Sequence, residues 1–143
     1  MESPIKYKLV KMDLPQFATF EEEYKPEDAE IEFFNRFQFA YNFDDHLVLC
    51  KTIIEISKEK KLLLKADFDC IFKIEEKSAQ SLENDTEAIV PPILLAQFAS
   101  LAYGSLRGAL YVKTLGTPFN SIILPPNDIF SVFKEPQHFN RKQ

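Results

Sequence analysis

Two pairs of side chains in this chain have the types and spacing from which a reactive site could be built. The first pair is Asp67 and Asp69, whose carboxylates would share one face of a strand, as paired catalytic acids do. Lys65 and Lys73 occupy the same face, so we expect a solvated surface with cross-strand ion pairs. The sequence has no nucleophile-elbow, phosphate-loop or dinucleotide-binding motif. We therefore expect no enzymatic activity.

The second pair is Cys50 and Cys70, which could ligate a metal or form a disulfide. His46 and His138 are the only histidines that could join them, and the spacing matches no zinc motif. The acidic stretch 21–32 lacks the glycine-punctuated spacing of a calcium loop. We expect two buried thiols on adjacent strands in a reducing compartment, with no metal and no cofactor.

Composition limits the class of protein. A chain of 143 residues is one domain, and its apolar surface comes largely from fourteen phenylalanines, with no tryptophan and three glycines. Such a domain either packs a thick aromatic core or displays aromatic surface to a partner. The net charge of -5 argues against nucleic acid, because phosphates require a basic face.

Hydrophobic alternation predicts four antiparallel strands in the first half of the chain. Between residues 61 and 75 the even positions are apolar and most odd positions are charged, which is the pattern of a strand with one buried face. Residues 47–57 form the preceding strand, joined to it by a polar turn at residues 57–60. Residues 31–43 form another strand, and residues 5–12 form the first, which Pro15 ends or kinks. The acidic stretch 21–32 is then an exposed crossover.

Residues 91–115 predict one long helix. Pro91 and Pro92 suit its first turn, where a missing N–H costs nothing. One helical face is marked by residues that recur at steps of four and three, namely Leu94, Phe98, Leu101, Ser105, Gly108, Val112 and Leu115. Gly116 offers a left-handed C-terminal cap, and Pro118 prevents the helix from resuming. An apolar strip follows, and Asn127-Asp128 caps a last short helix.

The resulting fold class is α+β, with a four-stranded antiparallel sheet followed by helices. We expect a single domain with the sheet in residues 1–77, a polar loop in 78–90 and the long helix in 91–115. The turn and extended apolar strip occupy 116–126, the short C-terminal helix 127–134 and a polar tail 135–143. No basic-then-apolar signal opens the chain, and polar residues and prolines interrupt the apolar stretch 88–112. We expect a cytoplasmic protein without membrane insertion.

This order of elements resembles SecB, the export chaperone that holds unfolded polypeptides, and its SecB-like relatives. That family joins its long helix to a Gly-Thr-Phe-Pro-type turn, a Leu-x-Leu-x-Pro strip and an Asn-Phe-Asp start of the final helix. The turn is matched here, with Phe and Pro exchanged, by Gly116, Thr117, Pro118 and Phe119. The strip and helix start are matched approximately by Ile122, Leu124, Pro125, Asn127 and Phe130.

The resemblance implies an ATP-independent holdase that binds unfolded polypeptide in an apolar groove, without a cofactor. The candidate groove residues are Phe17, Phe20, Phe33, Phe119, Ile122, Ile123 and Leu124. In an extended strip Ile122 and Leu124 point one way and Ile123 the other, so either set could face inward. The alternative is that the strip only fills the gap between helix and sheet.

The resemblance also implies a homo-oligomer, in which dimers pair their sheets and two dimers meet through helices. The small residues Gly104, Ser105, Gly108 and Ala109 would allow such a helix contact at short range, and they would equally suit packing on the chain's own sheet. We favour a tetramer over a dimer.

Two features separate this chain from the export chaperones that deliver clients to the SecA motor. The last residues, 138–143, are short and basic, and the outer face of the sheet mixes lysines with its acids. Client holding is therefore better supported than delivery to SecA. Two alternatives stay open: a module that stabilises one specific partner, for example in a toxin–antitoxin system, and a binder of a small apolar ligand in a phenylalanine-lined cavity.

Overall fold

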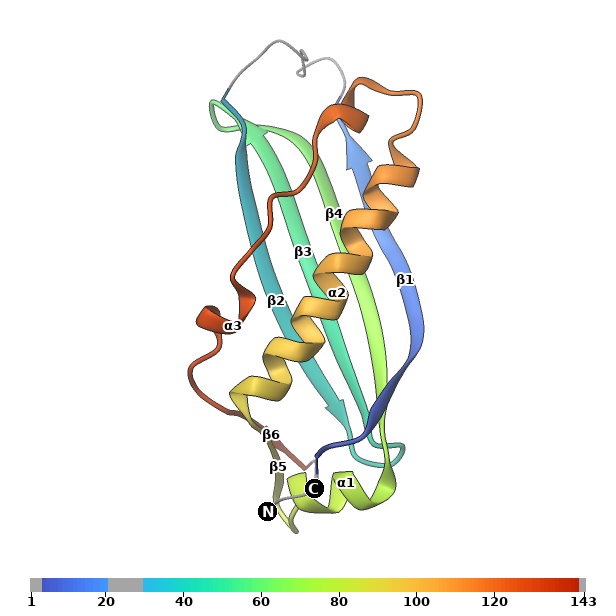
Figure 1. Cartoon of the computed structure of the whole chain (residues 1–143), viewed down its shortest axis with the longest axis vertical. Helices are drawn as coiled ribbons and strands as arrows, with labels where there is room; N and C mark the ends of the chain where they lie inside the picture. The colour runs from blue at the N-terminus through green and yellow to red at the C-terminus, as the bar shows by residue number, and fades with distance from the viewer. Residues whose placement is uncertain (1–3, 21–29, 142–143) are drawn as a thin grey trace.

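The computed structural model describes residues 4–20 and 30–141. It contains one antiparallel sheet of four long strands, with a single long helix lying diagonally across one face (Figure 1). The strands are β1 (Tyr7–Thr19), β2 (Glu32–Asn42), β3 (Leu47–Lys58) and β4 (Lys61–Ile74), in the order β1-β4-β3-β2. The predicted α+β class is confirmed. The expected acidic crossover between β1 and β2 falls mostly on residues 21–29, which lie outside the described ranges.

The first strand is longer than the sequence predicted. β1 continues through Pro15 to Thr19, with shifts of its register against β4 between Leu9 and Lys11 and between Asp13 and Gln16. The second shift contains Pro15, and an edge strand tolerates a proline because its missing N–H leaves no ladder bond unmade on the open side.

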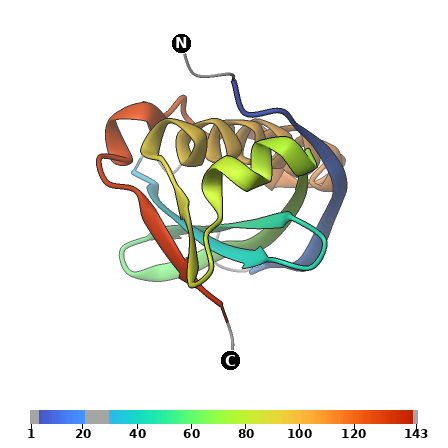
Figure 2. The same cartoon turned by 90° about the horizontal axis from the view of Figure 1, so that it is seen from below.

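A small second sheet lies at the foot of the molecule, seen from below in Figure 2. After β4 the chain forms α1 (Glu76–Leu82) and β5 (Glu87–Val90), and β5 pairs with the C-terminal strand β6 (Gln137–Asn140). The expectation of a polar loop over 78–90 is therefore wrong, and the expected polar tail 135–143 contains a strand at Gln137–Asn140. Both segments are polar and short, so their structure depends on tertiary contacts that local propensity does not encode.

The rest of the chain is the long helix α2 (Pro92–Lys113), a short 3-10 helix η2 (Pro118–Ser121) and the single turn α3 (Ile129–Val132). Gly116 has the expected left-handed conformation, with φ of +80°, just after α2 ends. The expected extended strip thus opens with the η2 turn. We call residues 122–136, which run back along the β2 side of α2, the strap (Figure 1).

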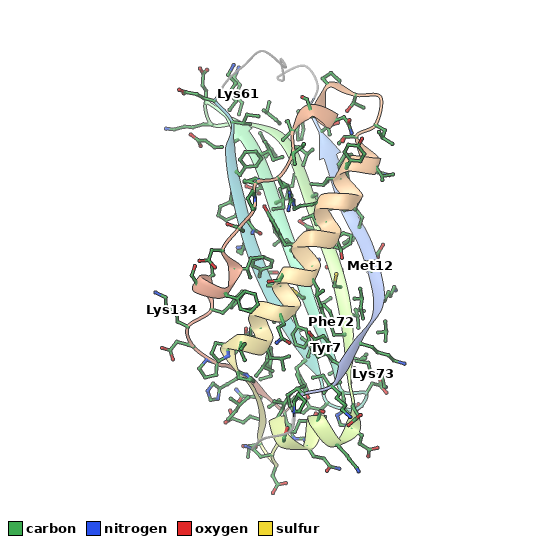
Figure 3. The ribbon with its side chains drawn as sticks, in the orientation of Figure 1. Tyr7, Met12, Lys61, Phe72, Lys73 and Lys134 are labelled. Carbon is green, nitrogen blue, oxygen red and sulfur yellow. The ribbon has the colours of Figure 1, made fainter. Side chains whose placement is uncertain are left out.

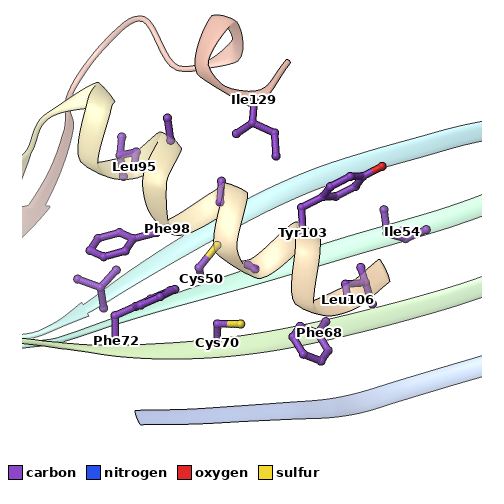
Figure 4. Close-up of a cluster of buried hydrophobic side chains, with 14 of the residues drawn as sticks. Cys50, Ile54, Phe68, Cys70, Phe72, Leu95, Phe98, Tyr103, Leu106 and Ile129 are labelled. Carbon is purple, nitrogen blue, oxygen red and sulfur yellow. The ribbon is translucent and has the colours of Figure 1, made fainter. Parts of the chain in front are cut away.

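The core lies between α2 and the inner face of the sheet (Figure 4). Phe72 on β4 stacks on Phe98 of α2 with ring centroids 4.5 Å apart, and Tyr7 meets Phe98 edge-on at 4.8 Å. The even positions of β4 face this core, as predicted. Cys50 and Cys70 sit opposite each other on β3 and β4, both buried and unpaired. Burial raises the pKa of Cys70 to about 11 and also raises the pKa of Cys50.

The outer face of the sheet carries the predicted cross-strand ion pairs. Lys51 on β3 lies 3.1 Å from Asp69 on β4, and Glu55 on β3 lies 3.9 Å from Lys65 on β4. The expected cross-strand ion pairs are therefore present, although one carboxylate oxygen each of Asp67 and Asp69 is buried.

The face of α2 that packs on the sheet differs from the face that the spacing of apolar residues predicted. The buried residues are Leu94, Leu95, Ala96, Phe98, Ala99, Ala102, Tyr103, Leu106 and Leu110. Leu101, Val112 and Leu115 instead point outward and are about half exposed or more, at 48%, 65% and 55%. Because small residues surround the helix, apolar spacing alone could not decide which face lies inward. α2 is long and apolar enough for a membrane span, with a mean hydropathy of 1.2 over a window that is 50% buried, but a core helix passes the same test.

The stacked ring pair predicts where the fold is most sensitive. Phe98→Ala should lower the free energy of unfolding by about 3–5 kcal/mol, because it removes a fully buried ring and leaves a cavity. Ile93→Ala, on the exposed start of the same helix, should change it by less than about 0.5 kcal/mol. Urea unfolding measures both, and equal effects would show that α2 is not packed on the sheet as described.

Candidate functional site

An apolar pocket of about 90 Å³ lies where the end of α2, η2 and the start of the strap meet the inner face of β3 and β4. It is lined by Ile56, Leu64, Arg107, Leu110, Tyr111, Thr114, Phe119, Ile122, Ile123 and Leu124. An apolar cavity of about 150 Å³ can hold benzene, so this pocket has room for roughly one aliphatic side chain.

The wall at the end of α2 is built by a hydrogen-bonded turn. The Thr114 hydroxyl donates to the Leu110 carbonyl at 2.7 Å, which closes the last helical turn. Thr117 then caps η2, because its hydroxyl accepts from the Phe119 N–H at 3.2 Å and donates to the Thr114 carbonyl at 2.8 Å. Asn120 donates from its side chain to the Tyr111 carbonyl at 2.8 Å. This turn places the Phe119 ring, which is 1% exposed, at the floor of the pocket.

The opposite wall is the first part of the strap. Leu124 is 4% exposed and Ile122 is half-buried, while Ile123 between them is 68% exposed. Of the two orientations that the sequence allowed, the structure has the one in which Ile122 and Leu124 point inward and Ile123 points outward. Phe119 and Leu124 serve the core as well as the pocket, whereas Ile123 presents its side chain at the mouth.

Few hydrogen bonds hold the strap in place. The Tyr103 hydroxyl donates to the Pro125 carbonyl at 2.6 Å, and burial raises the pKa of this tyrosine. Among the described residues, that is the one hydrogen bond between the backbone of residues 123–135 and the rest of the chain. Side chains supply the other contacts: Ile129 is buried, and the Phe133 ring lies 5.9 Å from Phe37 and 5.8 Å from Phe39 on β2.

Three of the predicted groove residues do not line the pocket itself. Phe17 is on β1 and Phe33 on β2, which are the two opposite edges of the sheet, and Phe20 follows the end of β1. Three strand spacings separate the edges by roughly 14 Å, so Phe17 and Phe33 lie on opposite sides of the two strands that line the pocket. Phe33 stands opposite the pocket residue Ile56 in the register of β2 and β3. Phe17 instead lies beneath the Lys113 ammonium, 5.9 Å from the ring centroid.

Sequence reasoning missed the helical residues that complete the pocket, above all Leu110, Tyr111 and Arg107. A signal for Arg107 was present. From residue 91 to residue 127 the only charged side chains are Arg107 and Lys113, and an isolated charge on an otherwise apolar helix marks a place where the helix meets solvent.

The two glycines proposed for an oligomer contact lie on the outward side of α2. Gly104 and Gly108 are exposed, and a Cβ added at either would meet nothing within 4 Å. Ser105 and Ala109 are half-buried beside them. The small size of the two glycines is therefore not required by packing on the chain's own sheet, whereas Ala109 packs against the core.

A polar cluster at the foot of the molecule, away from the pocket, holds the β2–β3 turn against the small sheet. Glu83 accepts from the Tyr41 hydroxyl at 2.8 Å and pairs with His46 at 2.9 Å, while Arg141 lies 3.9 Å away. Burial, followed by the Glu83 hydrogen bond, raises the pKa of Tyr41. Each group here is used in joining segments, so the cluster serves the fold. A wide crevice of about 1270 Å³ beside it is lined by both charged residues and prolines.

Comparison with known proteins bears on the fold. No family model matches the chain, and no curated protein matches it in sequence. Among solved structures, the chain is similar to the SecB-like chaperone Rv1957 of Mycobacterium tuberculosis, determined in complex with a ChAD peptide from the Rv1956 HigA1 antitoxin. The match has a TM-score of 0.54 and 12% sequence identity, and it covers 85% of this chain and 90% of that one. The chain has a SecB-like fold.

The hydrogen bond from Tyr103 to the Pro125 carbonyl, which anchors the strap, can be tested directly. Tyr103→Phe should lower the free energy of unfolding by about 0.5–1.5 kcal/mol, because it removes the hydrogen bond to Pro125 and leaves a carbonyl without its donor. Limited chymotrypsin digestion should cut the strap at the exposed Phe130 faster in this variant than in the wild type, because the strap is held less firmly. Tyr111→Phe, at an exposed ring of the same helix, is the control. Equal cleavage rates in the two variants would contradict the assigned anchor.

Proposed function

We propose that this protein is an ATP-independent holdase, which binds unfolded polypeptide by inserting apolar side chains into the pocket beside the strap. The observation that carries the proposal is the pocket itself: it has the volume of one side chain, and the exposed Ile123 stands at its mouth. Sites of this size can accept many apolar side chains without reading a sequence, which suits a general chaperone. The proposal requires no catalysis and no cofactor.

The outward side of the strap extends this apolar surface. Ile123, Phe130 and Val132 are 68%, 55% and 62% exposed. The backbone of the strap leaves most of its N–H and C=O groups without partners in the described chain, so an extended polypeptide could form main-chain hydrogen bonds beside it. A row of exposed apolar side chains next to open backbone groups supports binding of extended chain.

The volume of the pocket argues for a side chain over a small apolar ligand. Ligand sites in proteins usually measure about 300–1,000 Å³, and the pocket reaches about 90 Å³. The open crevice at the foot is larger but is lined partly by charged residues.

The second candidate function is stabilisation of one dedicated partner. It is favoured by a specific observation, since the structurally similar Rv1957 was determined with a peptide from an antitoxin. Both functions would use the same pocket, and they differ in the range of polypeptides bound. Protection of several unrelated proteins supports the general holdase, whereas protection of none supports the dedicated partner.

The proposal includes a cytoplasmic homo-oligomer, with the outward face of α2 as its helix contact. Gly104 and Gly108 would allow a close approach, and Leu101 and Val112 beside them would be covered. A dimer of dimers would place several pockets along one surface, long enough for an extended client. Delivery to a SecA motor is not part of the proposal.

Suppression of aggregation tests this function. Wild-type protein at stoichiometric amounts, without ATP, should keep several unrelated denatured proteins in solution. Ile123→Asp should remove most of that protection, because it places a charge at the mouth of an apolar pocket. Light scattering measures the effect.

Ile93→Asp is the matched control, because Ile93 is 63% exposed and lies at the opposite end of α2 from the pocket. A carboxylate in the first turn of a helix is also tolerated well. This variant should protect like the wild type, with the same oligomer size for both. Equal protection by the Ile123 and Ile93 variants would remove the pocket from the function.

A further inference from the structure

We infer that the pocket selects apolar client residues that are flanked by carboxylates, and that Arg107 is the residue that makes this choice. The inference rests on the proposed function, because it names the class of polypeptide segment that the same site prefers. Its basis is the charge around an otherwise apolar pocket.

Arg107 is the one charged residue in the pocket lining. It projects from the exposed side of α2, one helical turn after Tyr103, whose hydroxyl binds the Pro125 carbonyl of the strap. The guanidinium is close enough to that hydroxyl to oppose the rise that burial causes in the pKa of Tyr103. Arg107 therefore lies where α2 and the strap meet, beside the route by which a client side chain would enter.

No carboxylate of the described residues lies within ion-pair distance of Arg107. The nearest acid along β3, Glu55, is on the outer face of the sheet and pairs with Lys65. A guanidinium presents its donors in a fixed planar fork that matches a carboxylate. A client aspartate or glutamate next to the anchoring residue would supply that partner.

The segments of the chain that form most of the pocket carry only positive charges. Residues 91–127, which form α2, η2 and the first part of the strap, carry two positive charges and no negative one. The whole chain, in contrast, has a net charge of -5. The segments of α2, η2 and the early strap that line the pocket therefore offer Arg107 no carboxylate of their own, which leaves its charge available to an acidic client segment.

The expected preference is modest because Arg107 is exposed. An exposed ion pair typically changes an affinity by roughly two- to fivefold, and salt screens it. Such a factor cannot restrict binding to one partner. It would bias a general holdase toward apolar segments in an acidic context.

The test uses three end-blocked fluorescent peptides with the same central leucines, flanked by aspartates, asparagines or lysines. Fluorescence anisotropy at low salt should give the tightest binding for the aspartate peptide and the weakest for the lysine peptide. Arg107→Gln should make the aspartate and asparagine peptides bind equally, and Arg107→Glu should reverse the order. Lys134→Gln is the control, since Lys134 is exposed and lies far down the strap (Figure 3).

The outcomes separate this inference from the proposed function. If the wild type binds all three peptides with equal affinity, or if Arg107→Gln keeps the aspartate preference, the inference is wrong and polypeptide binding stands. If no peptide binds, both fail. Unchanged affinity of Arg107→Gln for the asparagine peptide shows that the variant keeps an intact pocket.

Discussion

The structure depends on how one helix covers one apolar sheet face. A helix with its side chains is about 10 Å wide, and four strands span roughly 14 Å between the axes of the outer two, with further side chains beyond. α2 crosses this face diagonally and contacts β3 and β4. Part of the sheet face on the β2 side must therefore be covered by another segment. The strap is this segment, with Ile129 and Phe133 packed beside α2 and over β2.

The pocket forms where these two covering segments, α2 and the strap, are joined. α2 must end to let the chain turn back, and the Thr114–Asn120 turn reverses it within a few residues. The strap that follows is held mainly by side chains, because its extended backbone has no strand partner within the described chain. The junction of helix end, turn and strap does not fill completely, and an apolar space of one side chain remains. A surface that is apolar, extended and sparsely hydrogen-bonded suits the binding of unfolded chain.

The main elements could be predicted because their signals are local. The alternation in residues 61–75, the paired prolines at 91–92 and Gly116 each specify a conformation without help from distant parts. What could not be predicted depends on tertiary contacts. β5 and β6 are short, and each is a strand only because it pairs with the other. The inward face of α2 is set by the packing of Phe98 on Phe72. Of the candidate site, the strip residues were found because prolines mark the strip. Arg107 was missed because its isolated charge indicates contact with solvent but not the presence of a pocket.

The central claim is that unfolded polypeptide occupies the pocket beside the strap. Methyl-resolved NMR of the intact protein, with an unfolded client added, tests it most directly. The account predicts that the methyl signals of Ile56, Leu110 and Ile122 shift, while those of Leu9 and Val10 on the β1 edge do not. Shifts confined to β1 or to the outward face of α2, with unchanged pocket methyl groups, would contradict it.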